Sequence, residues 1–313
     1  KEKKFTIHIA VVNKLVKLKK LKGIFPILYS FFNKNNSLDI KLMRDQISLI
    51  NDIKSHGIAC LGLATEVHKL DFNEKVQIIE LMMEKCSGLI PTAVTIQANN
   101  FREYVKLINI AKSNKADWII LQPLLKNNIT DKDCFDFFDQ LIPFTINTVV
   151  GVQNAKEYLG VGLTSYHINK LYNKYSNFRA IKGEASSVFM QEEIKKYPKD
   201  LVVFNGRGGQ EIIDNLTIGC RGIVPCLDGA DKLIKIYEYF KLKKIDKAEK
   251  EYNNIIPVIV FIMQSIENLV CYGKRVCAYR MGIKNVYDRD PFLKPTDFGI
   301  KKAKTISDFL GKF

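Results

Sequence analysis

The sequence has few of the residues and spacings that build metal sites. Its 313 residues include only four histidines, which are scattered and show no H-E-x-x-H or similar ligand spacing. Seven cysteines form an odd set without a C-x-x-C pair, and most lie in apolar runs such as IACLGL and CRGIVPC. We therefore expect no metal site. We interpret the cysteines as reduced thiols in or near the core, which favours a cytoplasmic protein over a secreted one.

Nucleotide-binding patterns are also missing. Neither G-x-x-x-x-G-K-[ST] nor G-x-G-x-x-G occurs, and the glycine-rich turn NGRGG (Asn205–Gly209) fits neither spacing. The first apolar run, GIFPILYSFF, is not followed by the glycine-rich phosphate turn of a doubly wound dinucleotide-binding sheet. The sequence therefore predicts no nucleotide cofactor.

No segment is both apolar and long enough to predict a membrane span. The N-terminal stretch KEKKFTIHIAVVNKLVKLKK is apolar over too few residues, and lysines follow it immediately. It also lacks the small-residue cleavage site of a signal peptide. We expect neither a membrane anchor nor export.

Acidic residues are outnumbered, with 33 Asp and Glu against 48 Lys and Arg, for a formal net charge of +15. Clustered positive charge would indicate nucleic-acid binding. Beyond residue 22, however, the lysines alternate with acidic and amide residues, as in KLKKIDKAEKEYNN. We interpret them as solvated helix faces and expect no nucleic-acid partner, although a positive field would attract an anionic substrate.

Short β-rich apolar runs alternate with longer amphipathic stretches, which is typical of parallel strands joined by helices. We predict eight strands: Gly23 to Leu28, Gly57 to Leu63, Ile90 to Ile96, Asp117 to Pro123, Asn147 to Asn154, Arg179 to Glu184, Leu201 to Gly206 and Gly222 to Cys226. Eight strands over roughly 200 residues match a closed α/β (β/α)8 TIM barrel, with an open doubly wound sheet as the alternative.

The alternation stops after Cys226, where only helix-like spacing continues. We therefore divide the chain into an N-terminal extension at residues 1–22, a barrel at residues 23–229, and helices packed on the barrel at residues 230–313.

Lys182 ends the sixth predicted strand, at the barrel end where active sites lie. Burying an ammonium is costly, and desolvation favours the neutral amine that can attack a carbonyl. A lysine in an apolar strand is more often simply ion-paired, and Glu184, two residues on, is the candidate partner. On these residues alone, both interpretations stay open.

From Gly23 onward the sequence resembles the dihydrodipicolinate synthase and N-acetylneuraminate lyase family of Schiff-base aldolases. The resemblance rests on four ordered motifs: GLATEVHKL after the second strand, VQN ending the fifth, AIKGEA on the sixth and FNGRGG after the seventh. It implies that Lys182 forms a Schiff base with a small anionic 2-oxo acid such as pyruvate. It also implies a homotetramer built as a dimer of dimers.

The ending, IIPVIVFIMQ followed by GKRVCAYRMGI and RDPF, is similar to the branch of 2-keto-3-deoxy sugar-acid dehydratases and aldolases. Three departures also set the chain apart from the synthase. Gln153, the second candidate catalytic residue beside Lys182, stands where family members commonly carry a proton-relay tyrosine, and an amide is no acid or base near neutral pH. Tyr158 replaces a substrate-binding arginine, and Leu124 and Leu125 replace a tyrosine pair.

The resemblance also suggests substrate contacts. Leu63, Ala64 and Thr65 match the turn that holds the substrate carboxylate, where backbone N–H groups and the Thr65 hydroxyl could serve. Asn154, Tyr158, Glu184, Gly206 and Arg207 are further candidates for binding. His68, which follows the turn, is interpreted as a helix-start or surface residue.

In the implied mechanism Lys182 attacks C2 and the iminium serves as an electron sink, so that a C3–C4 bond breaks or a hydroxyl leaves. No cofactor is needed. With Gln153 in place of the tyrosine, protons must travel through water, substrate hydroxyls, Tyr158 or Glu184. The alternatives are a dihydrodipicolinate synthase proper, a barrel with weakened chemistry that binds a 2-oxo acid, and a basic barrel acting at nucleic acid or membrane.

Overall fold

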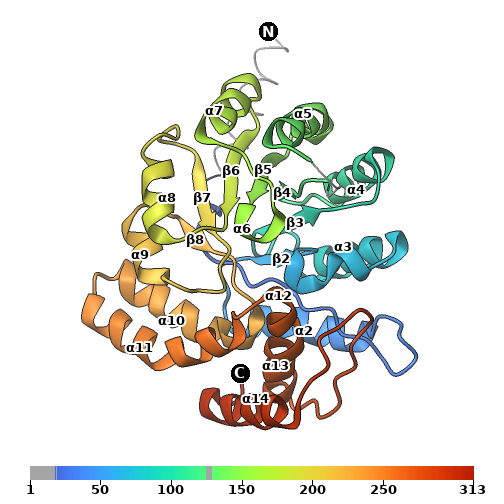
Figure 1. Cartoon of the computed structure of the whole chain (residues 1–313), viewed down its shortest axis with the longest axis vertical. Coiled ribbons are helices and arrows are strands. Elements are labelled where there is room, and N and C mark those ends of the chain that lie inside the picture. Colours follow the sequence, from blue (N-terminus) through green and yellow to red (C-terminus); the bar gives the residue numbers. More distant parts are fainter. Residues whose placement is uncertain (1–17, 19, 125–128) are drawn as a thin grey trace.

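The computed structural model describes residue 18 and residues 20–124 and 129–313, and its centre is an eight-stranded parallel barrel (Figure 1). The strands run in the order β1-β8-β7-β6-β5-β4-β3-β2. Their bounds are β1 Gly23–Ile24, β2 Ile58–Cys60, β3 Thr92–Ile96, β4 Trp118–Leu121, β5 Val149–Asn154, β6 Phe178–Gly183, β7 Val202–Asn205 and β8 Gly222–Ile223. The predicted barrel is confirmed, and most of the predicted 1–22 extension lies outside the described residues.

Ile27 closes the ring between the two ends of the sheet. It forms parallel bridges both with Ala59 of β2 and with Cys226, which follows β8. Pro26 has no N–H to donate, so β1 is shorter than predicted. The Pro26 carbonyl still accepts from the Ala59 N–H at 2.9 Å. The first strand therefore pairs on both sides despite its interruption.

The helices follow the strands around the outside. Those between strands are α2 Ile40–Asp52, α3 Phe72–Cys86, α4 Phe101–Ser113, α5 Asp131–Leu141, α6 Lys156–Leu159, α7 Ser165–Lys174, α8 Ser187–Ile194 and α9 Ile212–Thr217. Local signals start several of them; α3, for example, begins at a capping box between Asp71 and Glu74.

The C-terminal helices are α10 Ala230–Lys241, α11 Ile245–Ile262, α12 Ile266–Asn268, α13 Lys274–Arg280 and α14 Asp297–Leu310. A π-helical turn, Leu269–Gly273, joins α12 to α13. In Figure 1 the C-terminal helices gather in orange and red at one side of the barrel, next to α2. Their first member, α10, contacts β1, so this region is continuous with the barrel wall.

The second strand also ends earlier than predicted. Leu61 has a left-handed φ of 62°, which breaks the extended backbone directly after Cys60. Residues Leu63–Thr65 consequently form a single 3₁₀ turn at the barrel mouth.

Aromatic rings fill the barrel interior. The Phe204 ring lies 5.0 Å from that of Phe25 and 5.2 Å from that of Trp118, and all three side chains are fully buried. Because β4 and β7 are not neighbours in the sheet, these contacts cross the interior. The centre of the barrel is thus a packed core, and any site must lie at an end of it.

Asp228, which follows β8, gives the fold a measurable pH dependence. Burial raises the pKa of its carboxyl to about 6, while the Tyr29 hydroxyl donates to it at 2.7 Å. Between pH 4 and 6 the folded state therefore binds this proton more tightly than the unfolded state, and the group's contribution to stability falls as pH rises through that window.

We expect Asp228→Asn to remove this contribution, because the amide oxygen can still accept from Tyr29 but never ionises. The free energy of unfolding of the variant relative to wild type, measured by urea denaturation, should rise by about 2 kcal/mol between pH 4 and pH 7. A difference that is constant over this range would contradict the prediction.

Candidate active site

Lys182 lies near the carboxyl end of β6, between β5 and β7. It stands in register with Gln153 on one side and Phe204 on the other. The residue is only 4% exposed. A lysine so deeply buried must be neutral or paired with an acceptor.

Glu184 is that acceptor. Its Oε1 lies 2.5 Å from the Lys182 Nζ, and the two side chains are 5% and 3% exposed. The ion pair expected from the two-residue spacing is therefore present. The pair carries no net charge, which lowers the cost of placing both groups inside the protein.

Two glutamines extend this pair across neighbouring strands. The Gln153 amide donates from Nε2 to Glu184 Oε1 at 2.9 Å, and Gln122, directly after β4, donates to Gln153 Oε1 at 3.1 Å. Both glutamines are almost completely buried. The position of the usual family tyrosine thus holds an amide that orients the carboxylate of Glu184.

Gly206 leaves the space in which the pair meets. A Cβ atom there would lie 2.5 Å from Glu184 Oε1 and 2.7 Å from Lys182 Cε. Those separations are shorter than any ordinary contact, so a side chain at this position would push the two groups apart. Gly206, which was expected to bind substrate, lines the cavity and makes room for the ion pair.

The free space beside Lys182 is about 20 Å³, roughly enough for one water molecule. Ala64, Tyr158 and Gly206 line it together with the ion pair. The C-terminal helices cover this space with three side chains that lie between the end of α11 and the π-helical turn: Met263, Ile266 and Leu269. A ligand of several heavy atoms can enter only when part of this cover moves.

Three of the expected substrate contacts are already engaged elsewhere. The Thr65 hydroxyl donates to the Leu28 carbonyl at 2.6 Å. Asn154 bonds both backbone groups of Leu163, and Arg207 donates to Glu211 at 3.1 Å. These side chains hold the loops around the Lys182 cavity, and Asn154 also lines a larger cavity that shares Glu184 with it. Their contact with a substrate stays a prediction.

Other residues had no strong signal in the sequence. Gln122 follows a predicted strand, and only its contact with Gln153 reveals its part in the site. Met263 belongs to the motif that suggested the branch, but nothing in that motif shows that it covers Lys182. Leu124 does not line the cavity, and Leu125 lies outside the described residues.

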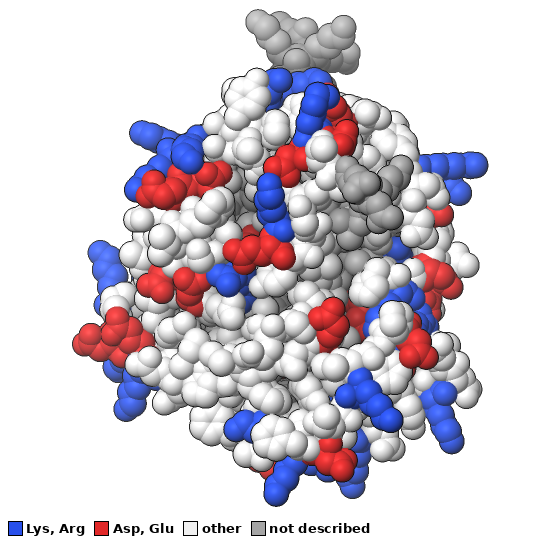
Figure 2. Space-filling view, viewed as in Figure 1, with Lys and Arg blue, Asp and Glu red and all other residues white. Residues whose placement is uncertain are grey.

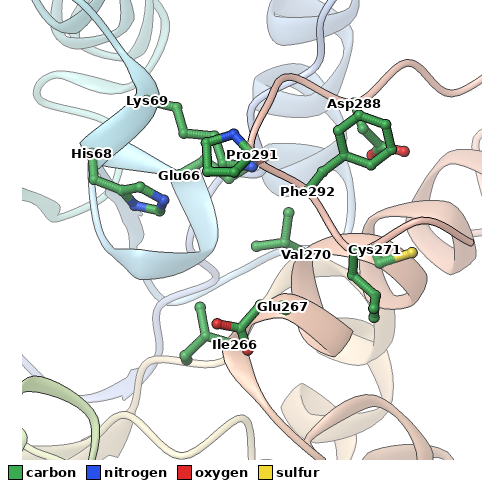
Figure 3. A pocket seen from close by; sticks show the side chains of 11 residues that line it. Glu66, His68, Lys69, Ile266, Glu267, Val270, Cys271, Asp288, Pro291 and Phe292 are labelled. Atoms are coloured by element: carbon green, nitrogen blue, oxygen red, sulfur yellow. Dashed lines mark hydrogen bonds and ion pairs between the residues drawn. The ribbon is translucent and has the colours of Figure 1, made fainter.

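A second cavity, of about 370 Å³, shares Ile266 with the Lys182 cavity (Figure 3). His68 and Lys69 come from the turn after β2, and Val270 rises from the C-terminal helices opposite them. His68 is exposed and lies in the short 3₁₀ helix Val67–Lys69, as its interpretation as a helix-start or surface residue expects, although partial desolvation still lowers its pKa.

Buried charges fasten this turn to the C-terminal helices. Glu66, with a left-handed φ of 54°, accepts from Lys69 at Oε1 and from Lys274 at Oε2, each at 2.7 Å. Asp288 lies 3.5 Å from the Lys274 Nζ and 2.5 Å from Arg275. Because Glu66 and Lys274 are both fully buried, they fix the turn of Ala64 against the segment that covers Lys182.

A third cavity, of about 650 Å³, shares Glu184 with the Lys182 cavity. Its walls carry polar groups from the loop after β5 and from α8, among them Lys156, Thr164 and Glu193. Glu184 therefore lines both the tight space beside Lys182 and a roomier polar one.

The residues that the structure describes contain no group of three or more His, Cys, Asp or Glu side chains that could hold a metal ion. Figure 2 shows basic and acidic side chains interspersed on one face, with no area of a single sign. No helix among the described residues is by itself long and apolar enough to cross a membrane. Helix α11 and the following Ile266–Arg280 segment, which are bent by 104° relative to each other, reach the necessary length and apolar composition only as a pair.

We expect Lys274→Met to destabilise the fold by about 3 kcal/mol, because it leaves Glu66 Oε2 buried without its cation. The matched control is Lys235→Met, which breaks an ion pair with Glu251 in which the lysine side chain is 49% exposed. This control should change the free energy of unfolding by less than about 1 kcal/mol. Equal losses in urea denaturation of the two variants would contradict the role given to Glu66.

Comparison with known proteins places this site in a family. The model of the dihydrodipicolinate synthetase family matches residues 20–306. A 4-hydroxy-tetrahydrodipicolinate synthase of Caldicellulosiruptor saccharolyticus is 22% identical over 76% of this chain and 80% of its own. A probable 2-dehydro-3-deoxy-D-pentonate aldolase of Escherichia coli is 23% identical over 66% of this chain and 69% of its own.

Solved structures give the same fold. A sialic acid aldolase of Ruminococcus gnavus superposes with a TM-score of 0.85 at 17% identity, covering 93% of this chain and 97% of that one. A dihydrodipicolinate synthase from Rhodopseudomonas palustris does so with a TM-score of 0.83 at 17% identity, covering 93% and 98%.

The family match extends over almost all of the described chain and includes Lys182 and Gln153 on their strands and Glu184 directly after β6. It confirms the resemblance read from the motifs and, at the level of the family, the expected lyase class. The chain belongs to the dihydrodipicolinate synthetase family.

Proposed function

We propose that the protein is a class I aldolase or dehydratase in which Lys182 forms a Schiff base with pyruvate or a 2-keto-3-deoxy sugar acid. The observation that carries the proposal is the buried Lys182 amine, which faces a cavity at the carboxyl end of a barrel strand. Active sites of such barrels lie at this end. A neutral amine there attacks C2 of the 2-oxo acid, and the iminium withdraws electrons from C3.

The substrate carboxylate would bind at the turn of Leu63 and Ala64. The first hydrogen bond of this turn runs from the Thr65 N–H to the Gly62 carbonyl. The N–H groups of Leu63 and Ala64 precede that bond, so the turn itself leaves them without an acceptor. Ala64 lines the Lys182 cavity. The backbone can hold an anion here although the Thr65 hydroxyl is engaged elsewhere.

A sugar acid fits the surroundings better than the synthase reaction does. Tyr158, which lines the cavity, stands where the synthase carries a carboxylate-binding arginine, and a phenol offers no such charge. The polar cavity beyond Glu184 has room for a hydroxylated chain. Dihydrodipicolinate synthesis proper is the alternative, because most of the named relatives are synthases of that pathway step.

Two further properties belong to this proposal. Seven buried cysteines, none of them in a disulfide, suit a reducing cytoplasmic setting. Exposed Tyr166 on α7 and exposed Val188 and Phe189 on α8 suit burial against another copy, in a homotetramer or dimer of dimers. Light scattering of the purified protein measures that assembly directly.

Borohydride reduction in the presence of pyruvate tests the Schiff base. Intact mass measurement should show an adduct on wild type and none on Lys182→Ala. The matched control is Lys75→Ala. Lys75 is buried to a similar degree, at 3% exposed, and burial lowers its pKa, but it lies on α3 beside Gln97. This control should keep the adduct. No adduct with any 2-oxo acid tried would contradict the proposal.

A screen of 2-keto-3-deoxy acids separates the remaining possibilities. Pyruvate release indicates cleavage, whereas loss of water without pyruvate release indicates dehydration. An adduct with no turnover of any acid would instead favour the barrel with weakened chemistry.

A further inference from the structure

We propose that Glu184 is the catalytic acid and base of this site and takes the part that a tyrosine plays elsewhere in the family. The inference rests on the proposed Schiff base at Lys182 and names the group that moves its protons. It follows from the contact between a carboxylate oxygen and the amine that must react.

The geometry allows direct proton transfer. Glu184 Oε1 lies 2.5 Å from the Lys182 Nζ, and neither side chain is more than 5% exposed. Bulk water therefore has little access to the amine in the closed site. The ammonium can lose its proton to the carboxylate without changing the total charge of the buried pair, so the transfer adds no net charge to a site of low polarity.

Formation of the Schiff base uses one proton that Glu184 takes from Lys182 and later returns. The proton moves from the Lys182 ammonium to Glu184, which leaves a neutral amine and a carboxylic acid. The amine nitrogen bonds to C2 and its proton passes to the former carbonyl oxygen, giving a carbinolamine. Glu184 then protonates that hydroxyl, which leaves as water while the nitrogen lone pair forms the iminium. As a carboxylate again, Glu184 accepts a C3 proton, and the C–H electrons form the enamine.

The other titratable groups that line the cavity are less suited. Burial raises the pKa of the Cys226 thiol far above its ordinary value, so it stays protonated. Tyr158 lines the cavity on the short helix α6, but among the described residues its hydroxyl forms no hydrogen bond with Lys182 or Glu184. Gln153 touches Glu184, but an amide does not exchange protons near neutral pH.

Gln153 is accordingly a positioning residue. Its amide donates to the same Glu184 oxygen that faces Lys182, and Gln122 holds the amide in that orientation. Gly206 leaves the room in which Glu184 reaches the amine. The carboxylate also lines the larger polar cavity, so it borders the space where C3 and the rest of the substrate would lie.

Glu184→Gln tests the assignment, because it keeps the shape and removes the charge. Exchange of the pyruvate methyl protons in D₂O, followed by proton NMR, reports the C3 step without any second substrate. We expect exchange to fall about 100-fold or more in the variant, in line with the usual contribution of a general base. The borohydride adduct should still form, but more slowly.

The matched control is Glu251→Gln. Glu251 is also paired with a lysine, Lys235, at 2.6 Å and its side chain is 24% exposed, but it lies on α11 and lines neither the Lys182 cavity nor the polar cavity. This control should exchange protons at the wild-type rate. In a second variant, Glu184→Ala, added formate should restore part of the exchange, which a purely structural role would not produce.

The outcomes separate the two proposals. Wild-type exchange rates in Glu184→Gln, with the adduct intact, would overturn the role of Glu184 and leave the Schiff base standing. Failure of wild type to form an adduct would overturn the Schiff base itself. If circular dichroism shows that Glu184→Gln does not fold, Glu184→Asp takes its place. This variant retains a carboxylate, so it should retain measurable exchange. Complete loss of exchange in a folded Glu184→Asp, together with no formate rescue of Glu184→Ala, would contradict the assignment.

Discussion

The site is organised by the requirement that the buried charge of Lys182 be balanced. An ammonium that is 4% exposed cannot stay charged without a partner, and Glu184 at 2.5 Å provides one. A buried ion pair adds little stability by itself, since desolvating two charges costs about as much as their attraction returns. Retaining it inside the barrel is therefore easier to explain by reactivity than by stability.

Much of the surrounding structure serves this pair. Gln122 and Gln153 orient the carboxylate, and the absence of a side chain at Gly206 lets it reach the amine. The C-terminal helices close the space above it, and the buried contact of Glu66 with Lys274 fixes those helices to the turn at Ala64. The cavity beside the Lys182 amine has room for about one water molecule, so its cover has to open before a ligand of several heavy atoms can enter.

The barrel could be predicted from the sequence because strand and helix patterns are local. The ends of strands were less predictable, since Pro26 and the left-handed Leu61 shorten β1 and β2 through backbone conformations that propensity does not reveal. The position of Lys182 and its pairing with Glu184 followed from strand alternation and a two-residue spacing. Contacts between distant segments could not be predicted in this way. Nothing near Glu66 in the sequence indicates its contact with Lys274, and nothing near Lys182 indicates that Met263 lines the same cavity.

Side-chain roles taken from family position were the least secure. Thr65, Asn154 and Arg207 occupy the expected loops, but each is bound to a neighbouring group, and such choices depend on distances that a sequence does not contain. Gln153 illustrates the same limit. An amide where a tyrosine is usual suggested a missing function, whereas its contact with Glu184 suggests a displaced one.

We propose that Lys182 reacts with the substrate while Glu184 holds the proton that the amine gives up. A crystal structure of the protein with bound pyruvate tests it most directly. We expect a covalent bond between the Lys182 Nζ and C2, with the pyruvate carboxylate against the backbone of Leu63 and Ala64 and with Glu184 beside the new bond. An unmodified Lys182 still paired with Glu184, while pyruvate occupies another cavity, would contradict it.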